Sequence, residues 1–185
     1  VNEKAVLLIL SADHEIKENK TFQKVILHGI KEAVNGRIVT FGIPPRSPET
    51  GYGYIEAINP IDFDQTKAIE IKRFIEKPDH KTAQRLIKDK RYLWNSGIFM
   101  FTPDILIEEI KKYSPEIFNS ANFLIENLSS DLDFQRLEKN IFKNCPDISI
   151  DFAIMEKTKI GTVIPLNSNW SDIGNWKSVW EYSDK

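Results

Sequence analysis

The sequence predicts an α/β protein, because apolar strand-like runs alternate with amphipathic helical stretches and polar residues gather where the two meet. An apolar run at residues 5–10 is followed by helical periodicity over residues 19–34 and by a second strand at 37–42. This β-α-β order is typical of parallel strands joined by a right-handed crossover. A second strand-helix-strand pattern spans residues 71–101. In open α/β sheets, ligands bind beyond the carboxyl ends of the strands, so polar residues there are candidates for a site.

The composition excludes several classes of protein. The 185 residues suffice for one substantial core, and 25 basic against 27 acidic residues give a net charge of -2, which does not favour nucleic acid as a partner. The single cysteine, Cys145, excludes an internal disulfide and a cysteine metal cluster, and it favours a cytoplasmic location. No apolar run reaches membrane-spanning length, so we expect no membrane association.

The first strand leads into a candidate metal ligand. Residues 5–10 form an unbroken apolar run, which predicts a strand covered on both faces. Asp13 follows it, and a carboxylate there suits Mg²⁺, although Asp13 taken alone is better explained as a turn residue or helix cap. The next helix is predicted over residues 19–34 and ends at Asn35-Gly36. Its apolar stripe consists of Phe22, Val25, Ile26, Ile30 and Ala33.

A stiff, polar loop separates the strand at 37–42 from the strand at 54–58. Its three prolines favour an extended path, and Gly51 and Gly53 would let the backbone approach a ligand closely because they have no Cβ. A structural turn is the alternative. Long polar loops more often carry function, which favours a ligand contact.

The central stretch is predicted to bring charged side chains to the end of a strand. Residues 71–75 alternate as a strand and deliver Glu76 and Lys77, after which Pro78 stops the strand. Asp79 is the predicted N-cap of a short helix. A surface ion pair followed by a turn is the alternative.

Further along this stretch, residues 94–97 are polar or small and precede a predicted apolar strand at 98–101. Helices are predicted at 103–112, 115–127 and 131–143, a short helix at 149–156, a strand at 161–166 and a closing helix to residue 182 after an acidic turn at 170–176.

Six motifs occur together in one order: LSADH, PETGYGYI, FIEKPD, LWNSGIFMF, SIDFAIMEK and NWSDIGNW. In this combination the chain resembles the mannose-1-phosphate guanylyltransferases, including bifunctional members that carry a phosphomannose isomerase domain. The resemblance implies a Rossmann-like, GT-A-like nucleotide-diphospho-sugar transferase fold: a mixed, mostly parallel sheet with helices on both faces. Residues 1–185 would be the central and C-terminal part of one catalytic domain.

The resemblance also implies a reaction, in which GMP passes from GTP to mannose 1-phosphate and gives GDP-mannose and pyrophosphate. Asp13 and Asp172 resemble the two carboxylates that hold Mg²⁺, both following strands of one sheet. Lys77 resembles the cation that meets the sugar phosphate.

The remaining site residues also come from this resemblance. Glu76 and Asn95 resemble the groups that bind mannose hydroxyls, and the Gly53 backbone would abut the sugar with Tyr52 beside it. Asp151 would be a further member of the substrate site.

Family members also carry a glycine-rich loop of the type GGxGxRLWP that cradles the triphosphate, and no such segment occurs in this sequence, which starts at Val1. We therefore expect a sugar-phosphate half with little or no transferase activity alone. Its sheet would be incomplete on the N-terminal side, with an open edge that favours a homo-oligomer.

Two alternatives stay open. One is a non-catalytic sugar-nucleotide sensor or regulatory subunit, which the retention of Asp13, Asp172 and Lys77 disfavours. The other is a pyrophosphorylase for a different sugar 1-phosphate and nucleotide.

Overall fold

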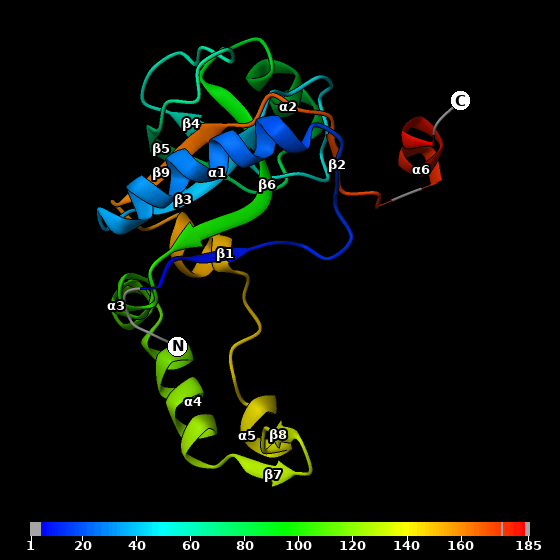
Figure 1. Cartoon of the computed structure of the whole chain (residues 1–185). Helices are drawn as coiled ribbons and strands as arrows, with labels where there is room; N and C mark the ends of the chain where they lie inside the picture. Colours follow the sequence, from blue (N-terminus) through cyan, green and yellow to red (C-terminus); the bar gives the residue numbers. More distant parts are fainter. Residues whose placement is uncertain (1–4, 175, 184–185) are drawn as a thin grey trace. The chain divides into compact units, whose positions relative to one another are not determined.

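The computed structural model describes residues 5–174 and 176–183 (Figure 1). The chain forms two compact units: the first comprises Val1–Pro103 and Lys159–Lys185, and the second comprises Asp104–Thr158. The assignment of residues 1–185 to one catalytic domain stays a prediction.

The first unit is built on a six-stranded sheet with the order β1-β6-β3-β9-β5-β4, in which β4 also pairs with β6. The sheet is mixed, as predicted, but the expectation of a mostly parallel sheet is wrong. Among the described strands only β3 and β9 pair in parallel, because β6 runs antiparallel between β1 and β3. The strands are β1 (Leu7–Ile9), β3 (Ile38–Ile43), β4 (Tyr54–Ala57), β5 (Ile69–Ile75), β6 (Tyr92–Phe101) and β9 (Gly161–Pro165).

β1 is the end strand of this sheet and is shorter than predicted. It pairs with β6 on one side. The side chains of the consecutive residues Ile9 and Leu10 are 47% and 50% exposed. The expectation that this apolar run is covered on both faces is therefore wrong at its end, because successive side chains of an extended chain point to opposite faces and both of these are about half exposed.

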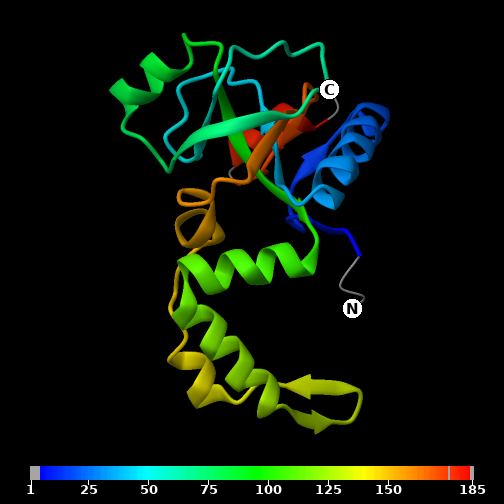
Figure 2. The same ribbon diagram turned by 90° about the vertical axis from the view of Figure 1, so that its left-hand side faces the viewer.

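Helix α1 (Asn19–Val34) has the predicted bounds and packs against β3, β6 and β9. Its buried residues are Val25, Gly29 and Ala33, whereas Ile30, which was expected in the buried stripe, is exposed. Gly36 has a φ of 82°, a left-handed conformation that ends helices and that glycine adopts without steric cost. Figure 2 shows α1 lying along one side of the strands.

β6 runs through the polar segment that was expected to precede it. The predicted start at residue 98 is wrong because Gly97, with a φ of 70°, lets the strand change direction without ending. The opposing strand shifts register between Thr40 and Gly42, so the irregularity is accommodated on both sides of the pair. Asn95 and Ser96 consequently lie inside a paired strand.

Three shorter elements complete the described part of the first unit. Helix α2 (His80–Leu86) is capped as predicted by Asp79, which accepts a hydrogen bond of 2.8 Å from the Thr82 N–H. The other elements are a ribbon formed by β2 (Glu15–Ile16) and β10 (Trp170–Ser171), and helix α6 (Trp176–Tyr182).

The second unit contains the two helices predicted after the central stretch, but a third predicted helix at 131–143 is wrong. A hairpin and a short helix replace it, because Leu132 has a φ of 54° and turns the chain at a point where a helix would need a negative φ. The elements are α3 (Pro103–Tyr113), α4 (Pro115–Glu126), β7 (Ser129–Asp131), β8 (Phe134–Arg136), α5 (Lys139–Lys143) and the π-helix η1 (Asp151–Met155). Across the described ranges of both units, every helix is too short or too polar to cross a lipid bilayer.

Candidate functional site

Three residues predicted to bind a sugar come together in the first unit. The Asn95 N–H donates a hydrogen bond of 2.8 Å to the Gly53 carbonyl. A Cβ added at Gly53 would lie 2.6 Å from Glu76 Oε2 and 3.5 Å from the Asn95 Cβ. The three positions meet because β4, which begins directly after Gly53, pairs with both β5 and β6.

The Asn95 amide is held in one orientation from within the sheet. Its Oδ1 accepts a hydrogen bond of 3.2 Å from the Gly97 N–H and lies 3.2 Å from the Thr40 hydroxyl, whose single proton is shared with the Ile98 carbonyl oxygen at 3.0 Å. With the carbonyl end engaged in this way, the amino group is the end suited to donate to hydroxyl acceptors. Thr40 was not predicted from the sequence, because a threonine in an apolar strand gives no signal of such a role.

Glu76 and Lys77 form the charged end of β5. Lys77 Nζ lies 3.2 Å from Glu76 Oε1, and the lysine side chain is 64% exposed whereas the glutamate side chain is 15% exposed. Lys77 has a φ of 42°, a left-handed conformation that costs a non-glycine residue on the order of 1–2 kcal/mol. The turn thus sends an ammonium group toward solvent beside a largely buried carboxylate.

Asp13 and Asp172 flank the ribbon of β2 and β10. Glu15 pairs with Ser171 in antiparallel register, and Asp13 lies two residues before Glu15 whereas Asp172 directly follows Ser171. The two aspartates therefore lie at one end of the same ribbon. The strands predicted to precede them, β1 and β9, both belong to the six-stranded sheet, as expected, and the ribbon is an additional two-stranded sheet beside the aspartates in the sequence.

Tyr52 contacts Asp172, one of the two aspartates beside the ribbon. Its hydroxyl donates a hydrogen bond of 3.1 Å to Asp172 Oδ1, which also accepts one of 3.1 Å from the Gly174 N–H. The ring packs edge-to-face on Trp94 and Trp170, with centroid distances of 5.2 and 5.5 Å. The family resemblance implied a place for Tyr52 beside the sugar and gave no sign of a contact with Asp172.

The donor set suits a hard divalent ion. Within residues 5–174 and 176–183, no three His, Cys, Asp or Glu side chains come together as a metal site. Mg²⁺ commonly takes one or two carboxylates together with substrate oxygens, so a pair of aspartates at the end of a ribbon fits it.

Asp151 belongs to the second unit, where it is the first residue of η1. Its predicted place in the substrate site stays a prediction.

Comparison with known proteins places the whole chain in one family. The family model described as nucleotidyl transferase matches residues 1–185. The chain belongs to the nucleotidyl transferase family.

Several relatives of this chain are named mannose-1-phosphate guanylyltransferase. Mannose-1-phosphate guanylyltransferase of Salmonella montevideo is 46% identical over 188 residues, which cover all of this chain and 40% of that protein. The chain thus spans about two fifths of the length of the curated relatives that it matches.

Solved structures confirm the predicted nucleotide-sugar transferase type of fold. One is described as mannose-6-phosphate isomerase from Helicobacter pylori, with a TM-score of 0.82 and 31% identity over 92% of this chain and 65% of that one. Another, described as mannose-1-phosphate geranyltransferase from Thermus thermophilus, has a TM-score of 0.80 and 29% identity over 97% of this chain and 50% of that one.

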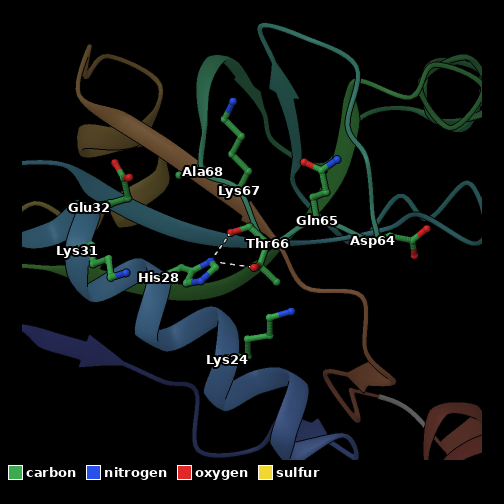
Figure 3. A pocket seen from close by; sticks show the side chains of 9 residues that line it. All are labelled: Lys24, His28, Lys31, Glu32, Asp64, Gln65, Thr66, Lys67 and Ala68. Atoms are coloured by element: carbon green, nitrogen blue, oxygen red, sulfur yellow. Dashed lines mark hydrogen bonds between the residues drawn. The ribbon is translucent and has the colours of Figure 1, made fainter.

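The nucleotidyl transferase also has a pocket of about 540 Å³ between α1 and the loop that precedes β5 (Figure 3). His28 Nδ1 lies 2.7 Å from the Thr66 carbonyl oxygen and 2.8 Å from the Thr66 hydroxyl, which ties the loop to the helix. None of the predicted site residues lines this pocket. Its lining carries charges of both signs, from Lys24, Lys31, Glu32, Asp64 and Lys67.

Proposed function

We propose that this region carries the sugar-phosphate side of a mannose-1-phosphate guanylyltransferase. The convergence of Gly53, Glu76 and Asn95 next to Lys77 is the observation that carries the proposal. A small residue beside a carboxylate and an amide leaves room for a polyhydroxylated ring and offers its hydroxyls an acceptor and a donor, and the ammonium group provides a counter-charge for the phosphate of the sugar. The relatives' printed activity names the substrate.

On the sugar side, the proposed roles follow from hydrogen-bonding capacity. The Glu76 carboxylate accepts hydrogen bonds from sugar hydroxyls, and the Asn95 amino group donates to them. A hydroxyl left without a partner in a closed site costs about 1–3 kcal/mol, so this pair would discriminate among sugars by the positions of their hydroxyls.

On the phosphate side, Lys77 would neutralise and hold the sugar phosphate. An oxygen of the sugar phosphate attacks the α-phosphorus of GTP and forms a new P–O bond. The bond between the α-phosphorus and the oxygen that bridges to the β-phosphate breaks, and pyrophosphate leaves. Positioning and charge neutralisation provide most of the catalysis in such transfers. Asp13 and Asp172 would hold Mg²⁺, which supplies positive charge beside the phosphates when bound.

We further propose that the 185-residue chain alone binds the sugar phosphate with little or no turnover. Support comes from the sequence, which contains no GGxGxRLWP-type loop for the triphosphate. A cytoplasmic location stays a prediction from the composition.

Calorimetric titration of the chain with mannose 1-phosphate, and separately with glucose 1-phosphate, tests the proposal. We expect tighter binding of mannose 1-phosphate and at least a tenfold loss in the variants Asn95→Ala and Lys77→Gln, because each removes a group worth about 1.5–3 kcal/mol in a charged or closed site. Lys81→Gln, at an exposed position of α2, is the matched control and should bind normally. Equal affinity for the two sugars, or unchanged affinity in both site variants, would overturn the assignment.

A further inference from the structure

We infer that Tyr52 is a positioning residue for Asp172 and that its hydroxyl serves the carboxylate rather than the sugar. The inference rests on the proposed function and deepens it. Tyr52 Oη lies 3.1 Å from Asp172 Oδ1, although the two residues are 120 positions apart in the sequence.

The hydrogen bonds to Asp172 fall on one oxygen. Oδ1 accepts from Tyr52 and from the Gly174 N–H, both at 3.1 Å. Two donors from different directions restrict rotation of the carboxylate, so Oδ2 faces a defined direction. A fixed second oxygen is what a divalent ion needs from a ligand, since its coordination geometry tolerates little displacement.

The backbone around Asp172 holds the same orientation. Ile173 has a φ of 48°, a left-handed conformation that is a genuine outlier for a β-branched residue. Its N–H donates a hydrogen bond of 3.1 Å to Ser171 Oγ, so the turn is fixed on both sides of Asp172. Strain of this kind persists only where the surroundings determine the conformation, and it is concentrated at functional sites.

The Tyr52 ring is itself held in place. It packs edge-to-face between Trp94, the neighbour of Asn95, and Trp170, which packs in turn on His14 with a centroid distance of 5.2 Å. Tyr52 also directly precedes Gly53, which abuts Glu76. One tyrosine therefore joins the sugar side of the site to its carboxylate side.

The loop that carries Tyr52 is anchored at a second point. Arg46 donates hydrogen bonds of 3.1 Å to Asn169 Oδ1 and 3.3 Å to the Ser168 carbonyl. With Tyr52 on Asp172, the loop is thus bound to the β10 segment at two points. The second anchor therefore helps to keep the Tyr52 hydroxyl within reach of Asp172.

The experiment separates ion binding from sugar binding. Mn²⁺, with free ion measured by electron paramagnetic resonance, probes the carboxylates, and calorimetry with mannose 1-phosphate in the absence of divalent ions probes the sugar side. Tyr52→Phe removes the hydroxyl and keeps the ring. Tyr54→Phe is the matched control, because its hydroxyl donates a hydrogen bond of 2.9 Å to the Glu49 carbonyl, away from Asp172.

We expect Tyr52→Phe to weaken Mn²⁺ binding about fivefold, which is the loss of one hydrogen bond of ordinary strength, and to leave ion-free mannose 1-phosphate affinity within twofold. Tyr54→Phe should change neither. Adding Tyr52→Phe to Asp172→Asn should cause no further loss of Mn²⁺ affinity, because Tyr52 acts on the ion only through the Asp172 carboxylate, which Asp172→Asn has already removed.

Several results would overturn the inference. Mn²⁺ affinity unchanged in Tyr52→Phe, or an equal loss in Tyr54→Phe, rejects a specific role for the Tyr52 hydroxyl while the sugar proposal stands. If the wild-type chain binds mannose 1-phosphate but no Mn²⁺, the role of Tyr52 is likewise rejected and the sugar proposal stands. If Mn²⁺ binds but the sugar phosphate does not, the proposed function fails, and the comparison of the two tyrosine variants still decides the role of Tyr52.

Discussion

Gly53 and Glu76 lie so close together that a Cβ at position 53 would stand 2.6 Å from the carboxylate oxygen Oε2. Gly53 does not adopt a positive φ in this structure, so the need for glycine comes from space rather than from backbone conformation. The atom in the way is the far end of a side chain, which can move. An added methyl group would therefore displace the Glu76 carboxylate and leave the backbone where it is.

Gly53→Ala should weaken mannose 1-phosphate binding at least tenfold while lowering the free energy of unfolding by less than about 1 kcal/mol, because the displaced group is a side-chain end. Gly51→Ala is the control, since a Cβ there meets no atom within 4 Å. Calorimetry and urea denaturation provide the two measurements. Normal binding by Gly53→Ala would remove Glu76 from the sugar site.

Lys77→Gly should separate stability from binding. Glycine relieves the left-handed backbone at φ 42°, and after its larger entropy in the unfolded chain is subtracted, the free energy of unfolding should rise by about 0.5 kcal/mol. Mannose 1-phosphate binding should be lost with the ammonium group. In Lys81→Gly, on the exposed side of α2, stability should instead fall by about 1 kcal/mol and binding should be normal. A destabilised Lys77→Gly would contradict the assigned strain.

Glu56 forms a buried charge cluster away from the site. Its side chain is 2% exposed, and its carboxylate lies 3.0 Å from nitrogens of Lys72, Arg73 and Arg91. Burial alone would raise the pKa of the Glu56 carboxyl, but hydrogen bonds from Lys72 and Tyr92 and the charges of the two basic neighbours on β5 outweigh it and hold the pKa below its ordinary value.

A lowered pKa in the folded state means that the ionised carboxylate stabilises the fold above the unfolded pKa of about 4.3, and that this contribution is lost as the pH falls below that value. Glu56→Gln should therefore lower the free energy of unfolding by about 1–3 kcal/mol at pH 7 and reduce the loss of stability between pH 5 and 3. Urea denaturation across that range measures both effects. If Glu56→Gln lost as much stability between pH 5 and 3 as the wild-type chain, other carboxylates would account for that loss.

The open side of β1 predicts self-association of the 185-residue chain. Residues 5–10 carry no charge or proline that would discourage edge pairing, and Ile9 is 47% exposed. Sedimentation velocity should show concentration-dependent dimers that Ile9→Lys abolishes. Ile58→Lys, at an isoleucine 45% exposed in the turn after β4, should leave them intact. A wild-type chain that stays monomeric at high concentration would contradict the prediction.

The elements that depend on neighbouring residues could be predicted from the sequence. Helix α1 was placed to the residue, because its apolar period and the Asn35-Gly36 stop are local, and so was the Asp79 cap. The course of β6 was not predicted, since whether a polar segment ends a strand or continues it depends on the partner strand. The hairpin at Leu132 was missed because its sequence also suits a helix, and the backbone turn there leaves no mark in the hydrophobic pattern.

For the site, spacing alone indicated that Glu76 and Lys77 end a strand. The meeting of Gly53 with Glu76 and Asn95 follows from β4 pairing with two strands, which no local pattern encodes. The likeness of the motifs to a known family supplied that grouping. The contact between Tyr52 and Asp172 was in neither source, because it depends on how a loop closes over the β10 segment.

The place at which the second unit joins the first has a consequence for how such chains vary. Its two connections leave from either side of β3, where Val39 pairs with Met100 on β6 and Ile38 pairs with Gly161 on β9. Two strand spacings separate them, about 10 Å, which three or four residues can span. Residues 104–158 are in this sense an insertion between β6 and β9, the two strands that flank β3. Lengthening, shortening or exchanging that insertion would leave untouched the register that sets Asn95 against Gly42.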